Sequence, residues 1–170
     1  MKNKFILISI AVIILAVAGF FVYKQITLPV QPPSTQPTNF NLIFKYGVGA
    51  KNELNTFDQT YTKDLIMDPP VTIKFKLTDS ELAGIYQKIN DLKLFDKTVE
   101  PAEGEIVQRR IPCDSYYLKV QNDSVQKELS WDNCQGEISD KFQQFTSYIT
   151  SIIEARDEYK KLPEGKGGYK

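Results

Sequence analysis

The chain has 170 residues, of which 21 are basic and 21 acidic, with two cysteines and no histidine. The lack of histidine excludes Ser-His-Asp and Cys-His catalysis, histidine zinc sites and the usual general base near neutral pH. From residue 39 onward there are 18 basic and 21 acidic residues, because three of the lysines come earlier, and no basic stripe is present. We therefore expect no nucleic acid partner.

The first 24 residues predict a transmembrane signal anchor. Phe5 to Tyr23 is a run of nineteen uncharged residues, close to the length of helix that crosses a bilayer. Two lysines precede the run and one follows it, so we expect a single-pass protein of the cell membrane with its N-terminus in the cytoplasm. The alternative is a secreted protein, produced by signal-peptide cleavage near Ala18. Apolar residues continue past that position, which favours the uncleaved anchor.

Residues 25–38 are predicted to be a proline-rich linker. Leu28 to Pro37 contains four prolines and no charge, a composition typical of an extended, semi-rigid spacer. We expect it to hold an extracytoplasmic domain, residues 39–162, away from the membrane. The three glycines after Pro163 predict that residues 163–170 are a flexible tail.

The domain is predicted to open with three strands. Phe40–Tyr46 alternates apolar and polar side chains, as a strand with one buried face does. Thr56-Phe57 and then Thr60 to Met67 form the second extended run. Asp68-Pro69-Pro70 is expected to turn the chain, since neither proline can donate to a strand ladder. Val71 to Leu77 again alternates, which predicts a third strand.

The glycine-rich stretch Gly47-Val-Gly-Ala-Lys51 lies between the first two of these runs. A phosphate-binding loop would need a helix to begin directly after the glycines. No helix pattern begins there, so we expect a loop whose glycines adopt positive φ.

A helix is predicted to begin after Thr78. Thr78 and Glu81 have the spacing of a capping box, and Leu77 is placed to pack against Leu82 around the cap. Apolar side chains recur at helical spacing up to Ile89, so the helix should end near Asn90 or Asp91.

Residues 113–134 predict a β-hairpin whose two loop residues are Asp123 and Ser124. In this register Leu118 faces Leu129, Tyr116 faces Trp131 and Lys119 faces Glu128. A shift by two residues would place Lys127 opposite Leu118 and Trp131 opposite Asp114, which is a less favourable pairing on both faces of the hairpin. In the unshifted register Cys113 stands opposite Cys134. In an exported chain this pairing favours a structural disulfide over a metal pair or redox-active thiols.

The last helix is predicted to follow Ser139 and to end at Pro163. Its apolar stripe runs from Phe142 through Ile149 to Tyr159. Together the elements predict an α+β fold, in the order three strands, helix, two strands, helix. We expect an antiparallel sheet of about five strands with both helices on one face.

Several phrases resemble a family of small, uncharacterised, exported or membrane-anchored bacterial proteins. They are Phe44-Lys-Tyr-Gly-Val-Gly-Ala-Lys-Asn52, Thr60-Tyr-Thr-Lys-Asp64, Leu77-Thr-Asp-Ser-Glu-Leu82, Tyr116-Tyr-Leu-Lys-Val-Gln-Asn122 and Tyr159-Lys-Lys-Leu-Pro163. The resemblance implies a sheet with helices and an extracytoplasmic location, and it implies no activity.

The long polar connection from Asp96 to Pro112 is the candidate interaction loop, because loops of this length in compact domains are often functional. Its charged residues are Glu100, Glu103, Glu105, Arg109 and Arg110. A glycosidase would need two carboxyl groups held at a fixed separation by a rigid frame. We do not expect a loop that contains Pro101 and Gly104 to provide such a frame. No calcium-binding loop pattern is present, and we expect no metal or cofactor.

These observations favour a membrane-anchored, extracytoplasmic binding or interaction domain without catalysis, whose partner is a protein or a glycan. Two alternatives stay open. One is a carboxylate-based hydrolase acting on envelope glycans. The other is a structural component of an envelope assembly, which should show an exposed apolar patch on its sheet.

Overall fold

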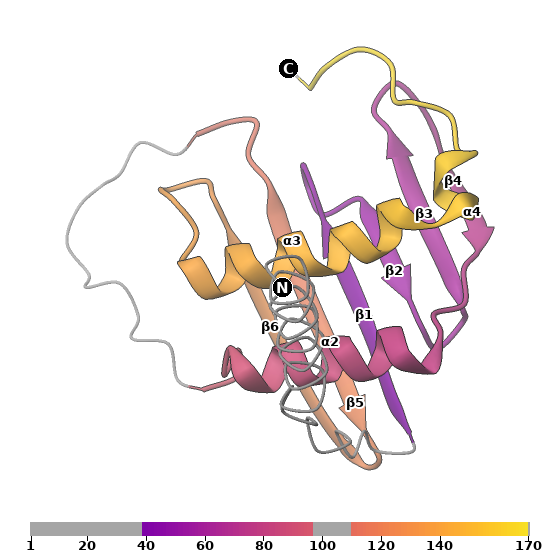
Figure 1. Ribbon diagram of the computed structural model, residues 1–170. Coiled ribbons are helices and arrows are strands. Elements are labelled where there is room, and N and C mark those ends of the chain that lie inside the picture. The colour runs from indigo at the N-terminus through magenta and orange to yellow at the C-terminus, as the bar shows by residue number, and fades with distance from the viewer. Residues whose placement is uncertain (1–38, 97–109, 170) are drawn as a thin grey trace, which may run out of the picture. The chain divides into compact units, whose positions relative to one another are not determined.

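The computed structural model describes residues 39–96 and 110–169 (Figure 1). The predicted anchor, the linker and most of the candidate interaction loop lie outside these residues. Among the helices of the described part, none has the length and apolarity needed to cross a membrane.

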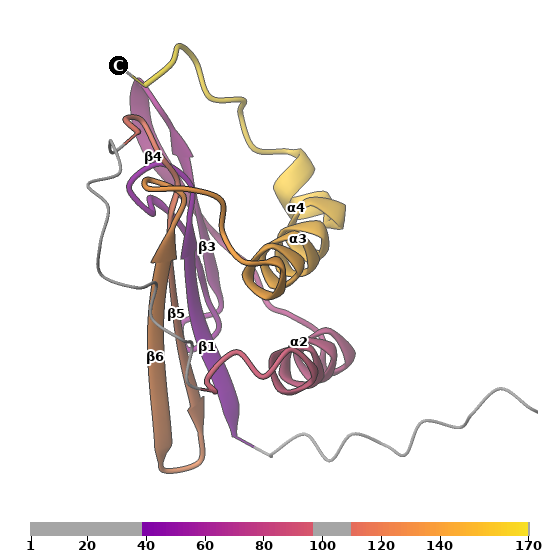
Figure 2. The same cartoon turned by 90° about the vertical axis from the view of Figure 1, so that its left-hand side faces the viewer.

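The fold is α+β, with one antiparallel sheet covered by helices on one face (Figure 2). The sheet has six strands in the order β4-β3-β2-β1-β5-β6, where about five were predicted. The strands are β1 (Phe40–Tyr46), β2 (Asn52–Asn55), β3 (Thr60–Leu65), β4 (Asp68–Lys74), β5 (Ser115–Asn122) and β6 (Val125–Asp132). The helices are α2 (Asp79–Asp91), α3 (Asp140–Ala155) and the short α4 (Asp157–Lys160).

The core lies between the sheet and the helices, and β1 runs through its centre. Leu42 and Phe44 of β1 are fully buried and belong to one apolar cluster with Ile85 of α2 and Ile149 of α3. Burial of apolar surface is the main source of stability here, so the alternation predicted for β1 decides which face the helices cover. No helix among the described residues covers the opposite face, which carries polar side chains, including the ion pair between Lys45 and Glu53.

The position of strand β2 differs from the sequence prediction. Asn52–Asn55 is extended, whereas Thr56–Gln59 is the turn that leads to β3, so the extended run expected at Thr56-Phe57 was wrong. The strand has one inward apolar side chain, Leu54, which is too short a pattern to recognise. It is held by pairing with β1 on one side and β3 on the other.

The turn expected at Asp68-Pro69-Pro70 was also wrong, because these residues begin β4. The chain turns instead at Ile66 and Met67, and Leu65 pairs with Asp68. Strand β4 lies at the edge of the sheet, where one side needs no ladder partner and proline is tolerated. The regular strand ends at Lys74 rather than Leu77.

The predicted capping box at the start of α2 is confirmed. The Glu81 backbone N–H donates to Thr78 Oγ1 at 3.2 Å, and the Thr78 backbone N–H donates to Glu81 Oε2 at 2.7 Å. Two of the backbone donors that a helix start leaves unpaired are thus satisfied. The helix ends at Asp91, within the predicted range.

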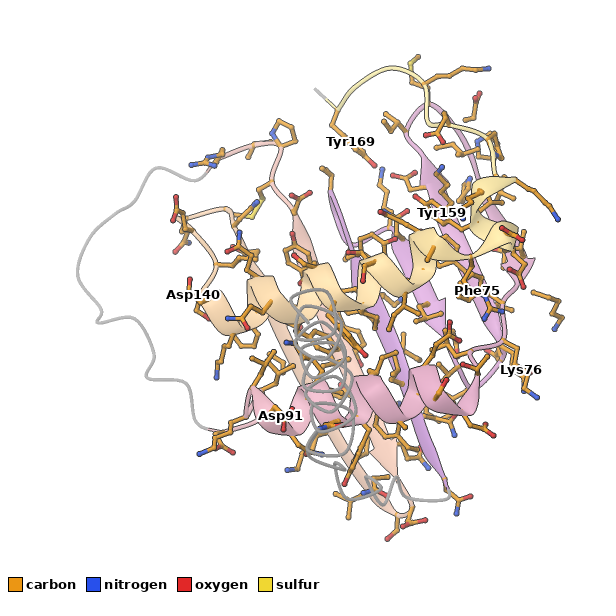
Figure 3. All side chains as sticks on the ribbon, viewed as in Figure 1. Phe75, Lys76, Asp91, Asp140, Tyr159 and Tyr169 are labelled. Atoms are coloured by element: carbon orange, nitrogen blue, oxygen red, sulfur yellow. A yellow bond between two sulfur atoms is a disulfide. The ribbon has the colours of Figure 1, made fainter. Side chains whose placement is uncertain are left out.

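The last helix is interrupted at Arg156, where a single helix through Tyr159 was expected. Arg156 is extended, with φ −77° and ψ 140°, between α3 and α4. Its guanidinium donates to Glu81 Oε2 at 3.1 Å and to the Lys76 carbonyl at 3.2 Å. Glu81 lies in the first turn of α2, and Lys76, labelled in Figure 3, lies in the connection before that helix. The break therefore depends on tertiary contacts that helical periodicity does not encode.

The predicted hairpin is confirmed in loop, register and disulfide. Leu118 pairs with Leu129, Tyr116 with Trp131 and Lys119 with Glu128. Asp123 turns the chain with φ 50°. Cys113 and Cys134 are joined by a disulfide, with their Cα atoms 5.1 Å apart.

Candidate functional site

The disulfide lies at one end of the sheet, beside the part of the predicted site that the structure describes. Arg110 is exposed, and its backbone N–H donates to the carbonyl of Cys134 at 2.7 Å. The candidate loop therefore returns to the sheet beside the disulfide. Glu100, Glu103, Glu105 and Arg109 lie outside the described residues.

A hollow of about 360 Å³ lies at this end, and we call it the disulfide-end hollow. Val48 and Gly49 line it on one side, residues 111–113 and Ser115 on another, and Tyr169 on a third. Ile111 is 76% exposed at its edge, a high value for a large apolar side chain. The hollow is thus built from the glycine turn, the end of the candidate loop and the C-terminus.

The glycine turn has the backbone that its sequence predicts. Gly47 has φ 89° and Gly49 has φ 66°, the region in which side chains are disfavoured. The Gly47 carbonyl accepts from Ala50 N–H at 2.9 Å and from Ser115 N–H at 3.0 Å. These bonds fix the turn against the start of β5, and they position Val48 and Gly49 beside the hollow.

The third wall comes from the C-terminal segment, for which the sequence predicts a flexible tail. The Tyr169 hydroxyl donates to the Asp64 carboxylate, and Lys51 Nζ lies 4.9 Å from the centroid of the Tyr169 ring (Figure 3). Lys166 forms a parallel bridge with Ile66 and an ion pair with Asp68 at 3.7 Å. No motif marks these contacts in the sequence. An isolated tyrosine in a glycine-rich ending is the only signal for them.

Charged residues of both signs lie near the residues that line the hollow. Lys51 and Arg110 are both exposed. Of the nearby acids, Asp64 accepts from Tyr169, and Asp114 accepts from the Asn133 amide at 3.3 Å. Burial and then the Asp114 carboxylate raise the pKa of Tyr116, so this phenol stays neutral.

The described residues contain no group of three or more His, Cys, Asp or Glu side chains that could hold a metal ion. The disulfide occupies both cysteines. The buried hydroxyls of Tyr46 and Tyr61 lie 2.6 Å apart, and burial raises the pKa of both, so neither is a base or nucleophile near neutral pH.

A scan against models of protein families finds no match to this chain. A search of curated proteins likewise finds no match.

Proposed function

We propose that the protein is a membrane-anchored, extracytoplasmic interaction domain that binds a polypeptide partner at the disulfide-end hollow. The observation that carries the proposal is the exposure of Ile111 at the edge of the hollow, 76% of its surface. An apolar contact surrounded by polar groups is the usual anatomy of a protein interface. Lys51, whose Nζ lies over the Tyr169 ring, and Arg110, the exposed neighbour of Ile111, favour a partner segment with an apolar side chain next to aspartate or glutamate.

The location is part of the proposal and rests on two observations. The uncharged run from Phe5 to Tyr23 has the composition of a membrane-spanning helix. The Cys113–Cys134 disulfide is compatible with an oxidising compartment outside the cytoplasm. If both hold, the protein stays with the membrane after alkaline extraction, and protease added outside the cytoplasm degrades the domain. A soluble protein after extraction would instead indicate cleavage near Ala18.

The binding proposal is tested by photo-cross-linking in living cells. A photoreactive amino acid at position 111 should capture one dominant protein. The matched control places the same amino acid at position 57, because Phe57 is an exposed apolar side chain in the turn at the opposite end of the sheet. Equal capture from both positions would contradict a site at the disulfide end.

Two variants sharpen the test. Lys51→Glu with Arg110→Glu should weaken capture at position 111, because it reverses the charge at the rim. Deleting Glu100 to Glu105 should abolish capture and leave the fold intact if the candidate loop contributes to binding. Unchanged capture in both variants would refute the proposed site.

The described residues do not favour the two alternatives. The glutamates of the hydrolase hypothesis lie outside them. The uncovered sheet face carries the Lys45–Glu53 and Lys119–Glu128 ion pairs and a hydrogen bond between Thr62 and Thr72, not the apolar patch expected of an assembly component.

A further inference from the structure

A second hollow, of about 260 Å³, lies at the opposite end of the sheet, and we call it the α2-end hollow. Its lining residues come from β1, from α2 and the chain that leaves α2, and from the end of the β5–β6 hairpin. Three aromatic residues line it: Phe40, Tyr86 and Phe95. The rings of Phe40 and Tyr86 meet edge to face, with centroids 5.2 Å apart.

The hollow also contains a polar group that the fold leaves unpaired. Asn122 pairs with Phe40 across β5 and β1, so its side chain is on the face that the helices cover. Its Oδ1 atom is buried and has no hydrogen-bond partner among the described residues. Buried amides are normally hydrogen-bonded, because desolvation without a partner is unfavourable. A donor on a bound molecule would satisfy it after a small rotation of the amide.

A cation stands at the mouth of the same hollow. Lys127 lies opposite Val120, which places its stem on the same covered face. Its Nζ is 5.7 Å from the centroid of the Phe95 ring. The next residue, Glu128, lies on the other face and pairs there with Lys119 at 3.9 Å. Within the part of the chain that the structure describes, no carboxylate forms an ion pair with Lys127.

We propose that the α2-end hollow binds a small organic carboxylic acid with an apolar body and an N–H or O–H donor. The aromatic walls suit the apolar body, Lys127 suits the carboxylate and Asn122 suits the donor. Mostly apolar hollows with a few convergent polar groups are the common form of small-molecule sites. At about 260 Å³ this hollow is slightly smaller than the range usual for drug-sized ligands, which is why the proposed ligand is small. An N-acylated amino acid with one apolar side chain has all three features.

The test uses the full chain in lipid nanodiscs and calorimetric titration. The probes are N-acetyl-phenylalanine, N-acetyl-leucine and the uncharged amide of each. We expect saturable binding of at least one acid, and binding of its amide about tenfold weaker, because the amide loses the charge-assisted bond to Lys127. Absence of saturable binding for both acids would overturn the proposal. Equal affinity of acid and amide would also overturn it.

Variants separate the roles of the polar groups. Lys127→Gln should weaken binding of the acid about tenfold and leave binding of the amide unchanged. Lys119→Gln is the matched control, since it makes the same change on the other face of the same hairpin and should affect neither probe. Asn122→Leu should weaken binding of the acid and of the amide by the same factor. Circular dichroism confirms that each variant is folded, and a Lys127→Gln variant that binds the acid normally would refute the site.

Discussion

Breaking the Cys113–Cys134 disulfide is predicted to lower the free energy of unfolding by about 3 kcal/mol. The two cysteines are 21 residues apart, and a cross-link of this span removes loop-closure entropy from the unfolded chain by about that amount at 25 °C. The native hairpin should persist, because its strands pair along eight residues each and Leu118 is fully buried. The effect is therefore expected in stability and not in fold.

The measurement is urea unfolding of residues 39–170, followed by the fluorescence of Trp131. This is the single tryptophan of the chain, and it stacks between Tyr116 at 5.3 Å and Phe142 at 4.8 Å, so unfolding changes its surroundings. With a slope of about 2 kcal/mol per molar, the midpoint should fall by about 1.5 M.

Two perturbations of the disulfide are compared. Replacing both cysteines with alanine avoids placing a polar hydroxyl at Cys134, which is 1% exposed. Reduction of the unaltered protein removes the bond without changing a side chain. If the oxidised and reduced proteins unfold at the same urea concentration, the entropic reasoning is refuted.

Three further predictions concern stability. Arg156→Ala should lower the free energy of unfolding by about 2 kcal/mol in the same urea assay, because it removes charge-assisted bonds to two other elements. Lys160→Ala, which loses an exposed pair at 3.8 Å, should change it by less than about 0.5 kcal/mol, and equal effects would contradict the role of Arg156. Gly47→Ala should lower the free energy of unfolding by about 1–2 kcal/mol, since φ is 89° and the new Cβ would lie 2.8 Å from a neighbouring side-chain atom. The control is Gly136→Ala, whose new Cβ meets no atom within 4 Å and which should leave the free energy of unfolding unchanged. Burial raises the pKa of Tyr61 above its ordinary value of 10.0, so its contribution to stability is complete below pH 10 and is lost as the pH rises further. When the urea midpoint is measured between pH 8 and 11.5, it should therefore fall above pH 10. The fall should be smaller in the Tyr61→Phe variant, and identical pH profiles of the midpoint for the two proteins would refute this.

Local sequence patterns predicted the parts of the fold that are encoded by neighbouring residues. The hairpin register follows from cross-strand pairs such as Leu118 with Leu129, because a two-residue shift would mismatch both faces. The capping box at Thr78 depends on residues three positions apart. The positive φ at Gly47 follows from the residue type. At the candidate site, the sequence supplied the disulfide and the glycine turn.

The remaining features depend on contacts between distant segments. Strand β2 exists because β1 and β3 pair with it, and the break after α3 exists because Arg156 reaches Glu81. Tyr169 lines the disulfide-end hollow, and its hydroxyl donates to Asp64, which is 105 residues earlier in the chain. In the α2-end hollow, Asn122 and Lys127 share a space with Tyr86 and Phe95 only once α2 packs on the sheet.

The sequence by itself therefore determined the α+β class, the apolar face of β1 and the covalent closure of the hairpin. Each of these follows from periodicity or from a short spacing between residues. Tertiary structure alone decided the sixth strand, the edge position of β4 and both hollows. A hollow is the space left between packed elements, and its walls are assembled from residues that have no fixed spacing along the chain.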